Sequence, residues 1–204
     1  MRTALYLVGG TMIYNVAEAV VALWAGTQAD SIALLGFGLD SIIETAAATV
    51  LLWRLAVQIR GASAERVEVT ERQVHRFVGG TFVALALYVV AQAGLTLWRH
   101  QPPDHSLVGI LLAMASLVIM PLVAWGKLRT ARTLGSRALA AEARETLACS
   151  YLSLTLLLGL AANAALGWWW ADPLAALLMV PWLVKEGIEG LRGGCCNECN
   201  HRDD

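Results

Sequence analysis

Residues 31–54 read SIALLGFGLDSIIETAAATVLLWR, an apolar stretch long enough to cross a bilayer that carries Asp40 and Glu44 near its middle. Positions four apart lie one helical turn apart, so the two carboxylates share a helix face. Each acid costs roughly 2.5–3.5 kcal/mol or more to hold in hydrocarbon, and the two repel each other. The pair therefore predicts a positive partner between its oxygens. The alternatives are a divalent metal ion, a proton or a buried arginine.

The composition indicates a membrane protein. Of the 204 residues, 57% are hydrophobic and only 15% are charged, whereas a soluble domain averages roughly 25% charged residues. The net charge of −1 gives no reason to expect a nucleic-acid partner, and the four cysteines do not suggest a disulfide framework. The N-terminal segment lacks a small-residue cleavage site, which predicts a retained first span rather than a signal peptide.

Six apolar segments of suitable length for a hydrocarbon core about 30 Å thick follow one another along the chain. They cover residues 4–25, 31–54, 77–98, 107–125, 138–166 and 173–188. We expect residues 58–76 to form a solvated loop and residues 127–137 to form a basic connector. The sequence thus predicts an all-α membrane protein, with a six-helix transmembrane domain over residues 1–190 and a short Cys/His-rich tail over residues 191–204.

Basic residues are distributed unequally between the two sides of this arrangement. Fourteen of the 15 lysines and arginines fall on the side of the termini or at its edge, and Arg99 alone falls on the other side. The positive-inside rule then predicts that both termini are cytoplasmic, in the inner membrane if the source is bacterial. Tryptophans are expected at the outer interface (Trp24, Trp98 and 168–170) and at the inner one (Trp53 and Trp125).

The segment 138–166 repeats the unusual pattern of the second segment. Glu145 and Cys149 are again four residues apart, and a hydroxyl residue again follows each of the two positions. Face to face, the two segments would offer three carboxylates and one thiolate, enough for a tetrahedral divalent ion. Depths counted from the outer ends put Asp40 and Glu44 about 14 and 20 Å down, against roughly 25 and 31 Å for Cys149 and Glu145. By this estimate Glu145 lies farther in depth from Asp40 and Glu44 than Cys149 does.

These stretches resemble the cation diffusion facilitators, a family whose second helix resembles GSxALLADAxHSxxD. Residues 30–44, DSIALLGFGLDSIIE, match that pattern position for position from Ser31. AEARETLAC (141–149), Asn163 and the GWWWADP turn (167–173) are similar to the family's fifth helix and the turn after it. The resemblance covers nearly the whole chain. It implies a six-helix transporter domain that exports zinc-type divalent cations in exchange for protons, as a homodimer alternating between inward- and outward-facing states.

The resemblance also implies four metal ligands, which fall on Asp40, Glu44, Glu145 and Cys149. The family usually has histidine and aspartate on each helix, whereas this chain has no histidine within the membrane segments. Oxygen-rich sets favour harder ions and a thiolate favours softer ones. The resemblance implies zinc first, while the mixed ligand set leaves iron(II), cobalt, manganese and cadmium open. The family's cytoplasmic C-terminal domain has no counterpart in these residues, which leaves the dimer interface open.

Other polar residues are candidates for accessory roles. Asn15 and Glu18 lie in the first segment near the depth of the acid pair; they are expected to complete the site, to relay protons or to form an interhelical hydrogen bond. Glu145, beside Arg144, also fits a position at the cytoplasmic edge. Cys149 on its own also fits a small apolar core residue.

The tail is a second candidate metal site. Its spacing resembles half of a zinc knuckle, and its candidate ligands are Cys195, Cys196, Cys199 and His201. Metal capture or delivery is one interpretation. Acylation, or an idle reduced tail, is the other.

Clustered acids without a metal ion would share protons, because neighbouring like charges raise pKa values. A metal ion from the cytoplasm would displace those protons, and protons from outside would displace the metal. No covalent chemistry is needed, so we expect no enzyme. The expected partners are the lipid bilayer, the metal ion, protons and a second copy of the chain. Two other functions stay open: a non-transporting metal-binding membrane sensor or adaptor, and a proton-coupled carrier of organic cations.

Overall fold

The computed structural model describes residues 2–59, 64–101, 103–134 and 137–192, and within them the chain is all-helical. The described helices are α1 (Arg2–Ala29), α2 (Ile32–Ile59), α3 (Ala64–Arg99), α4 (Leu107–Leu134), α5 (Arg137–Leu166) and α6 (Ala171–Leu191). Five of these, α1 to α5, are long and apolar enough to cross a membrane. α6 has 21 residues, a length that also reaches about 30 Å. The predicted all-α fold with six helices is confirmed.

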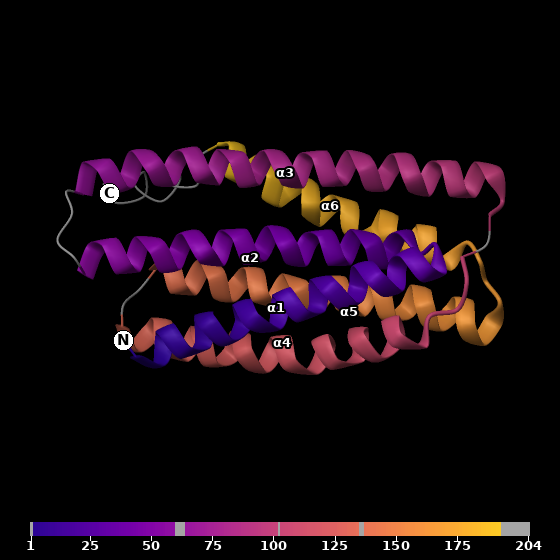
Figure 1. Cartoon of the computed structure of the whole chain (residues 1–204), viewed down its shortest axis with the longest axis horizontal. Coiled ribbons are helices and arrows are strands. Elements are labelled where there is room, and N and C mark those ends of the chain that lie inside the picture. Colours follow the sequence, from indigo (N-terminus) through magenta and orange to yellow (C-terminus); the bar gives the residue numbers. More distant parts are fainter. Residues whose placement is uncertain (1, 60–63, 102, 135–136, 193–204) are drawn as a thin grey trace, which may run out of the picture.

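The helices run roughly antiparallel along one long axis (Figure 1). The α1–α2, α3–α4 and α5–α6 connections gather at one end, which we call the loop end; α1 begins and α6 ends at the opposite, terminal end. Three residues with positive φ lie in the loop-end turns: Asp30 (49°), His100 (53°) and Gly167 (66°). Glycine adopts such angles freely, and Asp and His do so more often than most residues. These turns return the chain across the bundle within a few residues.

Two polar stretches expected outside the helices are helical instead. α2 continues to Ile59 and α3 begins at Ala64, so most of the expected loop 58–76 is helix. α4 continues to Leu134, so most of the expected connector 127–137 extends that helix. Both stretches are rich in Glu, Gln, Lys or Arg, which are good helix formers. A fall in hydropathy marks where a helix leaves hydrocarbon, and it need not mark where the helix ends.

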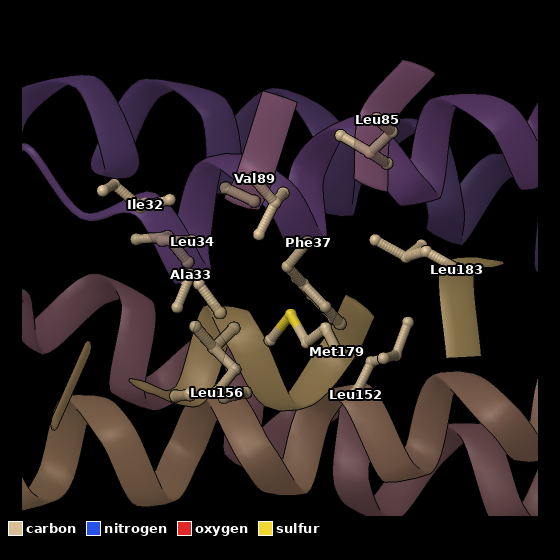
Figure 2. Packing of buried hydrophobic residues seen from close by; sticks show 14 of the residues in the cluster. Ile32, Ala33, Leu34, Phe37, Leu85, Val89, Leu152, Leu156, Met179 and Leu183 are labelled. Atoms are coloured by element: carbon tan, nitrogen blue, oxygen red, sulfur yellow. The ribbon is translucent and has the colours of Figure 1, made fainter. Parts of the chain in front are cut away.

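α2 lies at the centre of the bundle and packs against α1, α3, α5 and α6. Figure 2 shows the buried apolar cluster, in which Phe37 of α2 lies near Val89 of α3, Leu152 and Leu156 of α5 and Met179 of α6. None of these side chains is more than 2% exposed. Lipid tails are as apolar as these side chains, so close packing rather than removal from water holds such helices together.

α3 and α6 approach each other most closely at glycines. A Cβ atom at Gly79 would lie 2.6 Å from the backbone nitrogen of Leu191 and 2.8 Å from the carbonyl oxygen of Gly187. A Cβ atom at Gly187 would in turn lie 2.7 Å from Cγ2 of Val83. Small residues allow helix backbones this close together in membranes. The two glycines therefore fix α6 against α3.

A buried carboxylate ties α6 to the start of α2 at the loop end. Asp172, in the first turn of α6, is fully buried. Ser31 Oγ donates to its Oδ1 at 2.5 Å, and the backbone amide of Ile32 donates to its Oδ2 at 3.0 Å. The first amides of a helix have no partner within the helix, so an acceptor from another element stabilises that end. The register of α2, and hence the depth of its acids, is fixed from this end.

Candidate metal centre

α2 and α5 are neighbours, and together they bring three metal-ligating side chains to one place. One oxygen each from Asp40 and Glu44 of α2 and Sγ of Cys149 of α5 all lie within 4.8 Å of one another. Asp40 and Cys149 are 2% and 1% exposed, and Glu44 is partly buried. The four-residue spacing puts both acids on one face of α2. We call Asp40, Glu44 and Cys149 the three-residue cluster.

Glu44 is held in position by neighbours on two other helices. Cys149 Sγ donates to Glu44 Oε1 at 2.5 Å, and Asn15 Nδ2 of α1 donates to Glu44 Oε2 at 3.0 Å. The other side-chain atom of Asn15, Oδ1, is buried and has no hydrogen-bond partner. A buried amide oxygen without a partner is costly. Asn15 thus orients one ligand and leaves an acceptor beside the cluster.

Close helix contacts bring α1 to this position. A Cβ atom at Gly38 of α2 would lie 3.0 Å from Cγ of Leu23 and 3.1 Å from Cβ of Ala22, both on α1. A side chain at position 38 would require these two α1 residues to shift by a few tenths of an ångström. The glycine therefore allows close packing of α1 on α2 about two turns from Asn15.

The titratable groups in electrostatic range of Asp40 and Glu44 are acidic side chains. They are Glu18, Glu186 and Glu145 for Asp40, and Asp40, Glu18 and Glu145 for Glu44. Lys127 of α4 is fully buried, but its ammonium group is held by Glu142 of α5, with Nζ 3.0 Å from Oε1. Several acids in a low-dielectric interior without an opposing charge are strongly disfavoured unless they bind protons or a cation. The electrostatics of the described residues therefore favour bound protons or a bound cation at the cluster.

The spacing of the three ligand atoms suits a small divalent ion. Zinc binds oxygen and sulfur ligands at about 2.0–2.3 Å, which places two tetrahedral ligands about 3.3–3.7 Å apart. The widest separation, at most 4.8 Å, would need to close by about 1–1.5 Å, and the 2.5 Å between Cys149 Sγ and Glu44 Oε1 would need to open by about 1 Å. Oxygen and sulfur donors together fit a borderline transition-metal ion.

Glu145 lies apart from the three-residue cluster. It stands one turn before Cys149 on α5, toward the terminal end, and is not among the described side chains that gather within 4.8 Å. The charges acting on it are those of Glu186 of α6, Glu142 and Lys127. Glu145 and Glu186 thus place two acids on the terminal-end side of the cluster.

A second polar group lies beside the cluster, around Glu18 of α1, which is 1% exposed. Ser41 of α2 contacts Glu18 with Oγ 2.9 Å from Oε2, and Ser116 of α4 donates to Oε1. Ser116 also forms a hydrogen bond with the Tyr14 hydroxyl at 2.8 Å. Three helices meet in this network, which we call the Glu18 network (Tyr14, Glu18, Ser41 and Ser116). Sequence reasoning pointed to Glu18 but not to its hydroxyl partners.

A buried ion pair was also missed from the sequence. Lys127 Nζ donates to Glu142 Oε1 and to Thr146 Oγ1, both at 3.0 Å, and thereby joins α4 to α5. From the sequence, Lys127 was expected to begin a basic connector. Its position only two residues after Trp125, still next to the apolar run, was the signal that it could face inward.

The tail candidates Cys195, Cys196, Cys199 and His201 lie outside the described residues.

The sixth segment contains one acid whose position near the cluster was not predicted from the sequence. Glu186 follows an apolar run on α6 and acts electrostatically on both Asp40 and Glu145. An acid in the last turns of an apolar helix was the available signal.

Comparison with known proteins gives two matches. The model of a protein family described as the cation efflux transmembrane domain matches residues 11–192. An uncharacterized transporter from Synechocystis sp. is 29% identical over 187 residues, which are 86% of this chain and 60% of that protein. The chain therefore spans about 60% of the length of this curated relative. The matched region of the family model includes the three-residue cluster, Asn15 and Glu18.

Proposed function

Since the chain belongs to the cation efflux family, whose transmembrane domain covers residues 11–192, we propose that it exports a divalent transition-metal cation in exchange for protons. It is a multi-pass integral membrane protein of a transporter family. One observation carries the proposal: Asp40, Glu44 and Cys149 meet within 4.8 Å among acids. Zinc is the first candidate for the substrate, followed by iron(II), cobalt, manganese and cadmium.

The three-residue cluster supplies three ligands, and a fourth donor completes a tetrahedral set. Asn15 Oδ1 is one candidate, because it is buried without a partner and Nδ2 of the same amide donates to Glu44. Glu145, one turn away on α5, is the other candidate and would need the helix to shift or its side chain to reach farther. We propose that Glu145 first attracts the ion from the terminal end, together with Glu186, and joins the ligands in part of the cycle.

Competition for the same ligands is sufficient to couple the two flows. A divalent ion favours the ionised form of the carboxylates that bind it, so their protons leave as the ion enters. Protons that arrive from the other side bind the same oxygens and release the ion. No covalent step takes part.

The remaining features of the proposal concern orientation, assembly and the tail. The terminal end faces the cytoplasm, in line with the surplus of basic residues on that side. A second copy of the chain completes a homodimer. The tail over residues 191–204 captures metal ions near the cytoplasmic entrance through its cysteines and His201.

The test is metal uptake into inverted membrane vesicles, with one dye for the metal and one for pH. Asp40→Asn should lower metal uptake to less than about one tenth, because it removes a ligand and a buried charge. Glu189→Gln, at an exposed site on α6, is the matched control and should transport normally. Wild-type uptake by Asp40→Asn would contradict the assigned site.

The same experiment separates the other functions. A membrane sensor would bind the metal ion without moving it or protons. A carrier of organic cations would move its substrate even when a chelator removes all metal. Proton movement that appears only with a fitting metal ion supports the exchange proposed here.

A further inference from the structure

The Glu18 network contains more hydrogen-bond contacts than its hydroxyl groups can supply with hydrogens. Four contacts are present: Tyr14 with Ser116 (2.8 Å), Ser116 with Glu18, Glu18 with Ser41 (2.9 Å), and Ser41 with the Phe37 carbonyl (3.1 Å). Each contact needs a hydrogen of its own if it is to be a full two-centre hydrogen bond, since a hydrogen shared between two acceptors makes two weaker ones. The hydroxyls of Tyr14, Ser41 and Ser116 carry one hydrogen each, which makes three. One hydrogen is missing if Glu18 is a carboxylate.

Ser41 shows where the missing hydrogen belongs. Its Oγ lies within hydrogen-bonding distance of two oxygens, Glu18 Oε2 and the Phe37 carbonyl. A serine in a helix commonly donates to the carbonyl four residues earlier, and its single hydrogen cannot serve both acceptors well. If Glu18 is a neutral acid, its own hydrogen is donated to Ser41 Oγ, and Ser41 is then free to donate to Phe37. All four contacts are satisfied in this arrangement alone.

The surroundings of Glu18 also disfavour a charge. The titratable groups in its electrostatic range are Tyr14 on its own helix, Asp40 and Glu44 on α2, and Cys149 on α5, all of which are acids. On α4 the partner is the neutral Ser116, and the buried cation of that helix, Lys127, is paired with Glu142. An isolated buried charge costs several kcal/mol.

We infer that Glu18 is a neutral carboxylic acid that keeps its proton while metal ions and protons exchange at the three-residue cluster. Its hydrogen-bond network joins α1, α2 and α4 and holds Ser41, the residue after Asp40, in position. Glu18 is thus a positioning residue that does not bind the ion. The part of this inference that concerns exchange depends on the proposed transport; the protonation of Glu18 does not.

Charge balance supports the separation of roles. Asp40 and Glu44 as carboxylates neutralise a divalent ion completely, and two protons neutralise the same pair when the ion has left. Glu18 as a carboxylate would add an unbalanced charge to both states. A neutral Glu18 avoids that buried charge in both states, whatever number of protons leaves with each ion.

The decisive variant is Glu18→Gln, because a glutamine amide copies the neutral acid: its oxygen can accept from Ser116 and its nitrogen can donate to Ser41. We expect Glu18→Gln to bind and transport metal with less than about a tenfold loss, with the proton count per ion unchanged. Glu18→Ala leaves Ser41 and Ser116 without their partner and should weaken metal binding by about 10–100-fold. Loss of transport in Glu18→Gln, or a proton count lower by one, would overturn the inference.

Infrared spectroscopy of the purified, metal-free protein tests the protonation directly and needs no transport. The carbonyl band of Glu18 is the protonated-acid band that is present in the wild type at neutral pH and absent from Glu18→Gln, and it should shift in Ser116→Ala, because Ser116 donates to that group. Zinc addition should remove the bands of Asp40 and Glu44, whose protons the ion displaces, and should leave the Glu18 band in place. Loss of the Glu18 band with zinc, or wild-type and Glu18→Gln spectra without a difference in this region at neutral pH, would refute a permanently neutral Glu18. If the wild type moves no metal but keeps this band, the proposed transport fails while the protonated Glu18 stands.

Discussion

The buried ion pair between α4 and α5 allows a prediction whose size follows from the geometry. Lys127 Nζ is fully buried and lies 3.0 Å from Glu142 Oε1, and the Glu142 side chain is 10% exposed. Lys127→Met removes the cation and leaves a buried carboxylate whose other oxygen, Oε2, already lacks a partner. Breaking such a pair costs about 3–5 kcal/mol. For a chain of this size that corresponds to a fall in melting temperature of about 6–20 °C.

The double variant Lys127→Met/Glu142→Met should recover most of this loss. Replacing both members of a buried pair by apolar residues is often neutral or stabilising, by about 1–4 kcal/mol. Thermal unfolding in detergent, followed by the fraction that stays monodisperse, measures both variants. Lys185→Met is the matched control, because Lys185 and Glu189 are 3.9 Å apart and more than half exposed, and exposed pairs contribute about 0–1 kcal/mol. A double variant no more stable than Lys127→Met would refute the reasoning.

The remaining predictions concern the ligand set and the α3–α6 contact. Cys149→Asp should shift metal preference toward harder ions, with the affinity for manganese rising relative to cadmium by about tenfold or more in calorimetric titrations; an unchanged ranking would show that the thiol is not a ligand. Gly79→Ala should destabilise the protein by about 1–3 kcal/mol, because its Cβ would meet backbone atoms of Leu191 and Gly187 at 2.6 and 2.8 Å. Gly80→Ala, with open space around it, should be neutral or slightly stabilising in the same thermal assay, and equal losses at both positions would contradict this packing.

The sequence sufficed for the family and for the architecture, because both depend on patterns along one segment. Apolar runs fix the number of helices, and the four-residue spacings of Asp40 with Glu44 and Glu145 with Cys149 fix shared helix faces. The structure brings Asp40, Glu44 and Cys149 together and leaves Glu145 apart. The depth estimate had already set Glu145 farther from the acid pair than Cys149. Metal binding by these residues stays a prediction.

The partners of the acids could not be predicted, because they depend on how different helices rotate against one another. Ser116 reads as an ordinary serine in an apolar run, and only the packing of α4 on α1 brings it to Glu18. Lys127 reads as the first residue of a basic connector, yet α4 continues through it and turns it toward α5. Hydropathy locates a segment in the membrane, but it does not say which side of a helix meets a neighbour.

At the proposed metal site, the softness of the bound ion would determine the number of protons that leave with its binding. Asp40 and Glu44 already balance a divalent charge, so Cys149 has two ways to contribute. With a hard ion the carboxylates do the binding, and the thiol keeps its hydrogen bond to Glu44 Oε1. With a soft ion the sulfur binds as a thiolate, which releases one more proton and leaves the site one negative charge richer. No described cation is free to offset that charge near the cluster, since Lys127 is held by Glu142. The low-dielectric interior therefore disfavours binding through the thiolate. The preference for soft ions is then weaker than a sulfur ligand alone would give.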